Sequence, residues 1–74
     1  MVSNEDFTKN VGVRIRRLRL ERGMTQEELA CKMDMEGTSI GRIENGKRGL
    51  RFYTIYRFAA AFELSLEEFM KDLL

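Results

Sequence analysis

Two arginine-rich segments are the parts of this 74-residue chain whose side chains could do chemistry. Residues 14–22 and residues 42–57 each carry a net charge of +4, although the whole chain carries only +1. The acidic side chains gather in residues 25–36 and 63–74, where the net charge is −3 each. If the basic segments converge in space, they form a face that binds a polyanion. The alternative is two ordinary solvated helix faces, and charge alone does not decide between them.

The composition argues against enzyme or metal chemistry. The chain has no histidine, which removes the commonest general base and metal ligand. Its single cysteine, Cys31, has no partner for a disulfide or zinc cluster, and we interpret it as a small buried or half-buried thiol. The sequence around Lys47 lacks the glycine spacing and the Ser or Thr of a phosphate-binding Walker loop. We expect no enzyme activity, no metal, no cofactor and no small-molecule ligand.

No run of apolar residues approaches the roughly 18 that a membrane-spanning helix needs. The first ten residues, MVSNEDFTKN, lack the basic start and apolar stretch of a signal peptide. We therefore expect no membrane partner and a reduced, cytoplasmic protein.

Helical periodicity and capping residues must position the basic side chains. An apolar residue recurs every three or four positions over about 5–22, which predicts a helix that Gly23 ends. The pattern Thr25-x-x-Glu28 is a capping box, and it predicts a second helix over about 26–33. The apolar face of the first helix is formed by Phe7, Val11, Ile15 and Leu18.

Three further helices follow the same logic. We predict a helix over about 37–45 with Ile40 and Ile43 inward, one over 51–62, and a short one over 66–73 that begins at a Ser65 capping box. Five helices without a strand candidate predict an all-α fold in a single domain, residues 1–74. The inward residues of the fourth helix are predicted to be Phe52, Ile55, Phe58, Ala59 and Phe62.

The second and third predicted helices are joined by about three residues, which is helix-turn-helix spacing over residues 25–45. The strings TQEELA at 25–30 and SIGRIENGKR at 39–48 stand at the separation typical of one family. The chain resembles the Cro/C1-type (XRE) helix-turn-helix regulators of bacteria and phages. Its small size and Phe-rich C-terminal part also resemble the controller proteins of restriction–modification systems. The resemblance implies a five-helix, lambda-repressor-like DNA-binding domain that regulates transcription.

The resemblance also implies roles for particular residues. The third helix lies in the major groove of double-stranded DNA, where an arginine can bond guanine through a two-pronged contact. Arg19 and Glu44 match a family pair that forms a buried salt bridge. Asp34 replaces the usual turn glycine, and Glu36 replaces a better N-cap residue. The expected base contacts are Gly37, Thr38, Gly41 and Arg42, and the expected phosphate contacts are Gln26, Ser39, Asn45, Lys47, Arg48 and Arg51.

One such module contacts few base pairs, so we expect a homodimer that reads two half-sites of an operator. The C-terminal half carries more apolar residues than one small core requires. The alternative is an antitoxin-like protein-interaction module, in which this apolar surface grips another protein. The expected dimer interface consists of Tyr53, Tyr56, Phe69, Met70, Leu73 and Leu74.

Overall fold

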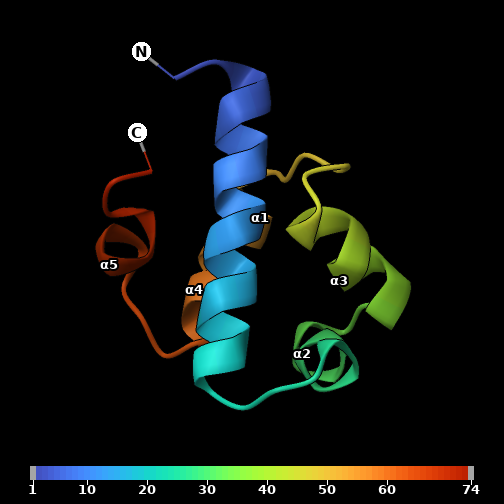
Figure 1. Ribbon diagram of the computed structural model, residues 1–74. Helices are drawn as coiled ribbons and strands as arrows, with labels where there is room; N and C mark the ends of the chain where they lie inside the picture. The colour runs from blue at the N-terminus through green and yellow to red at the C-terminus, as the bar shows by residue number, and fades with distance from the viewer. Residues whose placement is uncertain (1, 74) are drawn as a thin grey trace.

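The structure is a computed structural model that describes residues 2–73, and this range contains five helices and no strand. The long first helix runs through the middle of the molecule, with the second and third helices on one side and the fifth on the other (Figure 1). The predicted all-α, five-helix fold is therefore confirmed. The helices are α1 (Asn4–Glu21), α2 (Gln26–Met33), α3 (Gly37–Glu44), α4 (Phe52–Ala61) and α5 (Leu66–Met70).

Side chains and left-handed residues set the helix ends as the sequence predicts. Thr25 begins α2 with a complete capping box, and Ser65 does the same for α5. Gly23 takes a φ of 65° after α1, which glycine tolerates without steric cost. Asp34, at the turn between α2 and α3, takes a φ of 54°, so aspartate serves in place of glycine there. Glu36 precedes α3 and makes no side-chain capping bond.

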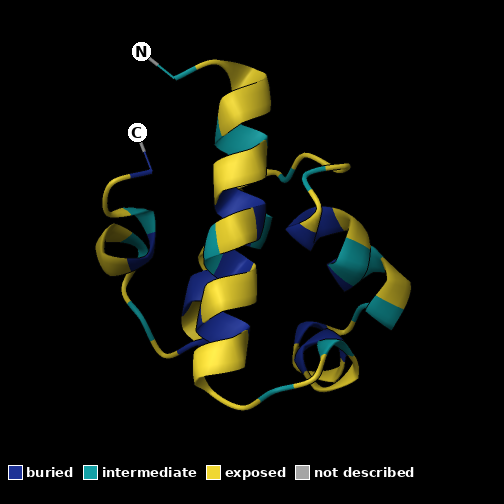
Figure 2. Ribbon diagram, viewed as in Figure 1, coloured by how far each residue is buried: buried dark blue, intermediate teal, exposed yellow. Residues whose placement is uncertain are grey.

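A single apolar core joins all five helices. Figure 2 shows buried residues along the sides of the helices that face one another. The largest side chains in the core are nearly or completely shielded from solvent, and they come from every helix. They are Ile15, Leu29, Met33, Ile40, Ile43, Phe58, Phe62 and Phe69.

Gly12 permits the close packing of α1 against the end of α3. A Cβ atom at position 12 would collide with the carbonyl oxygen of Ile43 and would lie 2.9 Å from that of Glu44. Backbone atoms cannot move aside as a flexible side chain can, so only glycine fits. No signal in the sequence marked this residue, because the contact joins positions more than 30 residues apart.

Two predictions about the ends of α4 and α5 are wrong. Helix α5 ends at Met70 rather than near residue 73, because Lys71 leaves the helical conformation and Asp72 takes a φ of 63°. Phe52, predicted to face inward, is 68% exposed. Side chains lean toward the N-terminus of their helix, so the first residue of α4 projects beyond the core.

No helix within residues 2–73 is long and apolar enough to cross a membrane.

Candidate nucleic-acid interface

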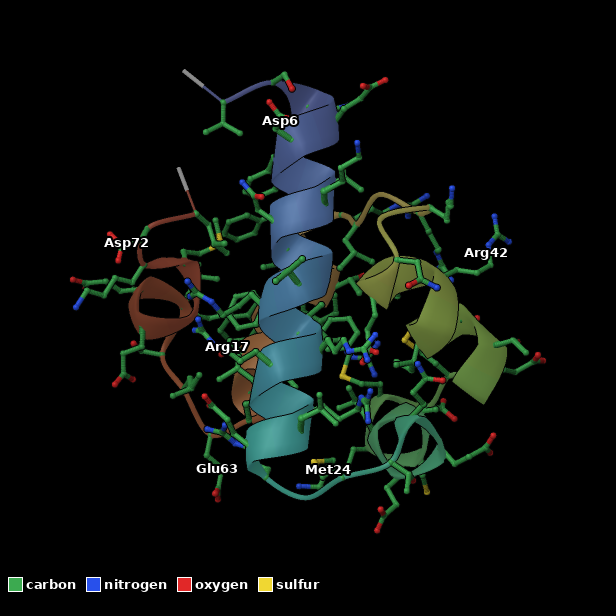
Figure 3. All side chains as sticks on the ribbon, viewed as in Figure 1. Asp6, Arg17, Met24, Arg42, Glu63 and Asp72 are labelled. Atoms are coloured by element: carbon green, nitrogen blue, oxygen red, sulfur yellow. The ribbon has the colours of Figure 1, made fainter. Side chains whose placement is uncertain are left out.

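Helix α3 has one buried face and one open face. Ile40 and Ile43 are at most 1% exposed and fix the helix against the core. Thr38 and Arg42 lie on the opposite, exposed face, and the Arg42 side chain extends away from the rest of the molecule (Figure 3). Gly41, between them, is half-buried. The open face therefore offers one cation and one hydroxyl.

A buried ion pair locks the orientation of α3. The Nε of Arg19 in α1 donates to Oε2 of Glu44 at 2.6 Å, and its Nη2 donates to Oε1 at 3.0 Å. The two side chains are only 9% and 1% exposed. Hydrogen bonding to Glu44 raises the pKa of Arg19 above its ordinary value. Arg19 also donates from Nη1 to the carbonyl oxygen of Met24 at 2.8 Å, so one guanidinium joins α1, α3 and the loop before α2.

Gln26, the first residue of α2, joins the same cluster. Its Nε2 donates to Oε1 of Glu44 at 3.1 Å. A Cβ atom at Gly41 would lie 3.6 Å from Oε1, 3.7 Å from Nε2 and 4.0 Å from Cδ of Gln26. Because Cδ is farther away than both Oε1 and Nε2, the oxygen–nitrogen edge of the Gln26 amide faces Gly41. The side chain that was expected at a phosphate thus packs against Gly41 and donates to Glu44.

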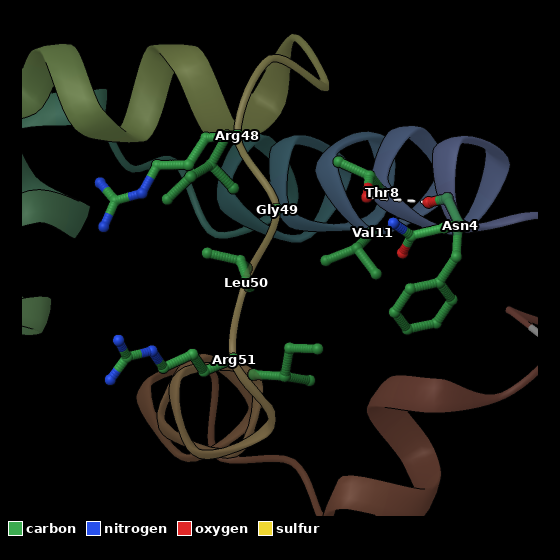
Figure 4. A pocket seen from close by; sticks show the side chains of 10 residues that line it. Asn4, Thr8, Val11, Arg48, Gly49, Leu50 and Arg51 are labelled. Carbon is green, nitrogen blue, oxygen red and sulfur yellow. Dashed lines mark hydrogen bonds between the residues drawn. The ribbon is translucent and has the colours of Figure 1, made fainter.

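Cations lie near the end of α3 and in the segment that follows it. We call Arg42, Lys47, Arg48 and Arg51 the basic surface; all four are exposed. In Figure 4 the guanidinium groups of Arg48 and Arg51 extend to the same side, away from Asn4 and Thr8. Asn45, also exposed, ends α3 between these cations, and Ser39 is half-buried within the helix.

The stems of two of these arginines border a cavity of about 350 Å³. It lies between the start of α1, the loop after α3 and the start of α4, and its floor is apolar (Figure 4). Its lining consists of Asn4, Phe7, Thr8, Val11, Ile43, Arg48, Gly49, Leu50, Arg51 and Ile55.

Arginines of the first basic segment are largely engaged inside the fold. Arg14 donates to the carbonyl oxygens of Phe69 at 2.7 Å and Lys71 at 2.8 Å, at the end of α5. Arg22 donates to the carbonyl oxygen of Phe62, at the end of α4, at 3.0 Å. Cations satisfy the free carbonyl groups at helix C-termini and offset the partial negative charge there. These two arginines and the buried Arg19 are engaged within the fold, whereas Arg16 and Arg17 of the same segment remain exposed on α1.

Exposed aromatic side chains form a separate patch on α4. Phe52, Tyr53 and Tyr56 are 68%, 69% and 52% exposed, and we call them the aromatic patch. The two tyrosine rings stack with their centroids 6.4 Å apart.

The other residues of the expected dimer interface differ from the aromatic patch in their exposure to solvent. Phe69 and Leu73 are 0% and 5% exposed, so their assignment to an interface is wrong. They complete the core of the single chain, which has few large residues to draw on. Met70 is half-buried, and Leu74 lies outside the described residues. Cys31, interpreted as a buried or half-buried thiol, is exposed on α2.

A short turn between two helices, the second of which has a fixed inner face and an open outer face, defines the helix-turn-helix class of DNA-binding proteins. The helix-turn-helix family HTH_3 matches residues 15–69. The chain belongs to this family, of the XRE or Cro/C1 type, as the sequence predicts. Its members are DNA-binding transcription regulators rather than enzymes.

Several relatives are small proteins of similar length. The control protein C.MunI from Mycoplasma sp is 29% identical over 69 residues, which cover 92% of this chain and 93% of that protein. The restriction–modification controller protein C.Esp1396I, solved in a nucleoprotein complex, is 34% identical with a TM-score of 0.80, and the match covers 90% of this chain and 87% of that one.

A larger relative matches in one part only. The HTH-type transcriptional regulator PrpR of Mycobacterium tuberculosis (strain ATCC 25618 / H37Rv) is 36% identical over 61 residues, which cover 82% of this chain. The match spans 13% of PrpR, so it concerns the helix-turn-helix domain and not the remainder of that protein.

Proposed function

We propose that two copies of this chain bind a specific double-stranded operator, each with α3 in the major groove, and thereby regulate transcription. The observation that carries the proposal is the fixed orientation of α3. Ile40 and Ile43 hold its inner face, and the buried pair of Arg19 and Glu44 holds its end. A recognition helix that is already in place loses little conformational entropy when DNA binds.

Base recognition falls to the open face. Arg42 can donate two hydrogen bonds to O6 and N7 of a guanine, and Thr38 can bond a base edge or contact a thymine methyl group. Gly37 and Gly41 carry no side chain and add no hydrogen bond of their own; the side chains of Glu27 and Gln26 lie next to them.

Phosphate contacts surround these base contacts. Helix α2 begins at Gln26. The free backbone N–H groups of its first turn form the positive end of the helix dipole and can bind a phosphate. The basic surface follows α3 on its other side, so the two groups bracket the groove. Asn45 and Ser39 supply polar hydrogen atoms within the same stretch.

The aromatic patch supplies the surface for a second copy. Tyrosine and phenylalanine are enriched in the cores of protein interfaces, whereas large exposed apolar patches are unusual on monomers. Tyr53 and Tyr56 on α4 and the half-buried Met70 on α5 remain from the expected interface once the core residues are removed. A symmetric dimer places its two recognition helices about 34 Å apart, one turn of DNA.

Similarity to C.MunI and C.Esp1396I supports a narrower role in controlling a restriction–modification system. Such a regulator acts where its DNA is, in the bacterial cytoplasm. Selection of bound fragments from genomic DNA tests this role. An operator upstream of restriction or methyltransferase genes is the expected result.

The binding mode is tested by comparing two arginine variants by fluorescence anisotropy. Arg42→Ala is expected to cost roughly 1–3 kcal/mol at one guanine per half-site and to relax the preference there. Arg17→Ala is the control, because this arginine is also exposed but lies on α1, away from α3 (Figure 3). Equal losses across all DNA sequences for Arg42→Ala would contradict the placement of α3.

The dimer is tested by sedimentation equilibrium on the wild type and on Tyr56→Asp. We expect a wild-type dimer and a folded Tyr56→Asp monomer that binds the operator much more weakly. A wild-type monomer of 8.7 kDa at every concentration, still binding operator tightly, would refute the dimer. The aromatic patch would then fit the alternative, a surface for a different protein.

A further inference from the structure

We propose that Lys9, in the first half of α1, binds a phosphate group of the operator beside the basic surface. The inference rests on the proposed function, since it requires α3 to lie in the major groove. It adds a DNA contact at a residue to which neither the residue pattern nor the family resemblance assigns a role.

The first support is the packing of Lys9 against the turn that ends α3. A Cβ atom at Gly46 would lie 2.9 Å from Cγ, 3.2 Å from Cα and 3.5 Å from Cβ of Lys9. The stem of Lys9 therefore passes directly over Gly46. In Figure 1 the loop that follows α3 runs close to the first half of α1, in agreement with these distances.

The second support is the place of Gly46 next to the basic surface. The backbone N–H of Lys47 donates to the carbonyl oxygen of Arg42 at 2.9 Å, and this bond folds the chain back over the last turn of α3. Lys47 is exposed and directly follows the residue that the stem of Lys9 crosses. The ammonium group of a lysine is only three bonds beyond Cγ, so the charge of Lys9 stays close to this turn.

The third support is that the charge of Lys9 is not neutralised inside the fold. Lys9 is exposed, and its ammonium group forms no ion pair within residues 2–73. Glu5 and Asp6, about one turn earlier on α1, are not paired with it. Like charges that gather on one face repel one another, and a polyanion relieves this repulsion.

The chemistry of the side chain suits a phosphate. A lysine ammonium is a compact point charge on a flexible stem, and it binds phosphate groups without the fixed geometry of an arginine fork. The phosphate strand that the basic surface contacts runs past the end of α3, where Lys9 joins it. Each neutralised phosphate releases counterions, so the contact has a measurable signature in the salt dependence of binding.

The test compares three variants with the wild type in anisotropy titrations of the selected operator at about 50 to 200 mM salt. Lys9→Met keeps an unbranched stem over Gly46 and removes the charge, whereas Lys9→Arg keeps the charge. Lys32→Met is the matched control, because Lys32 is an exposed lysine that borders a hollow between α2 and the end of α4. Circular dichroism checks that all four proteins are folded.

The expected change follows from the number of phosphates that lose a partner. One contact per copy, or two per dimer, makes the slope of log K against log salt less steep by about 1.8 in Lys9→Met, at about 0.9 per phosphate. The affinity ratio of wild type to Lys9→Met is therefore expected to shrink about 12-fold between about 50 and 200 mM salt. Lys9→Arg is expected to keep the wild-type slope, and Lys32→Met to change it by less than about 0.5.

A second measurement locates the contact on the DNA. Each phosphate of the operator is replaced in turn by a neutral methylphosphonate. We expect one position per half-site at which this replacement weakens the binding of the wild type. At the same position, the binding of Lys9→Met is expected to change by less than about 2-fold, since the lost charge has no partner in that variant.

The outcomes distinguish this inference from the proposed function. A Lys9→Met slope equal to the wild-type slope would overturn the inference, even with a loss of stability, because Lys9 would then only offset the partial negative charge at the C-terminus of α3. Equal changes for Lys9→Met and Lys32→Met would also overturn it, since they would indicate a charge that acts at a distance. If the wild-type slope is near zero, the proposed function fails as well, whereas a steep wild-type slope that Lys9→Met leaves unchanged removes only this inference.

Discussion

Arg19→Met is expected to destabilise the fold by several kcal/mol, and adding Glu44→Leu is expected to restore much of the loss. The single change leaves the Glu44 carboxylate, whose side chain is 1% exposed, with Gln26 as its remaining side-chain partner. It also removes the donor to the carbonyl oxygen of Met24. An uncompensated buried charge is the expensive consequence, rather than the loss of the pair itself.

The magnitude follows from the burial of both partners. Breaking a buried pair from one side costs about 3–5 kcal/mol. A domain of this length has a free energy of unfolding of only about 4–11 kcal/mol, so either single variant loses a large share of its stability. The double variant leaves the Gln26 amide and the Met24 carbonyl without a partner at about 1 kcal/mol each, because both are only part-buried and water can replace the bond. The two changes are therefore expected to be non-additive by at least about 2 kcal/mol.

Urea unfolding followed by far-ultraviolet circular dichroism measures all four proteins of the cycle. The control cycle uses Arg17 and Glu21, an exposed pair on α1 at 3.8 Å, whose coupling is expected to stay below about 0.5 kcal/mol. If a single variant is unfolded in buffer, recovery of a folded double variant still demonstrates the coupling. Additive losses at Arg19 and Glu44 would refute the reasoning, because they would mean that each side chain is stabilised independently.

Three further predictions concern stability and binding. Gly12→Ala is expected to destabilise the protein by about 1–3 kcal/mol or more, because the new Cβ meets backbone oxygens of α3. The same substitution at Gly41 is expected to stabilise the protein by about 0.5–1 kcal/mol, since the new Cβ makes only ordinary contacts. Thermal unfolding measures both variants, and a change in melting temperature of the same sign for both would contradict the packing argument. Backbone N–H donation from the capping residues lowers the pKa of Glu28 and Glu68 below the ordinary 4.5. The contribution of these two carboxylates to stability is therefore complete above about pH 4.5 and is lost as the pH falls through the lowered pKa values. Replacing both glutamates by glutamine is expected to reduce the pH dependence of stability in acid titrations followed by circular dichroism. An unchanged titration profile would exclude the two glutamates as the source of that dependence. Finally, log K for DNA should fall with log salt with a slope near −5 to −9 if a dimer neutralises about 6–10 phosphates, whereas a slope near zero in anisotropy titrations would remove DNA as the partner.

Local signals in the sequence predicted the helices and several of their ends. Thr25 and Ser65 begin helices because their hydroxyl groups and the glutamates three residues later satisfy backbone donors within the same turn. Such interactions span four residues, so they can be read without knowledge of the fold. The family was also predictable, because its two strings carry the turn, the inner face of α3 and the salt-bridge glutamate together.

Surface assignments in the C-terminal half were only partly predictable. Phe69 and Leu73 share the apolar character of Tyr56, and periodicity alone does not tell which of them a partner covers. The structure assigns the first two to the core and leaves the tyrosine exposed. Phe52 fits the spacing of an inward residue, yet it lies at the first position of α4, beyond the material that would bury it.

By itself the sequence determined the fold class, the helix-turn-helix and the family, since each depends on residues that interact within a turn or match a known string. Tertiary structure alone decided which arginines are free. Arg14 and Arg42 lie in two segments of equal net charge, but Arg14 donates to the end of α5, whereas Arg42 remains exposed on α3. The same is true of Gly12 and of the orientation of the Gln26 amide, because their partners lie 18 or more residues away along the chain. Contacts over such separations depend on how whole helices pack, and no local pattern of residue types encodes them.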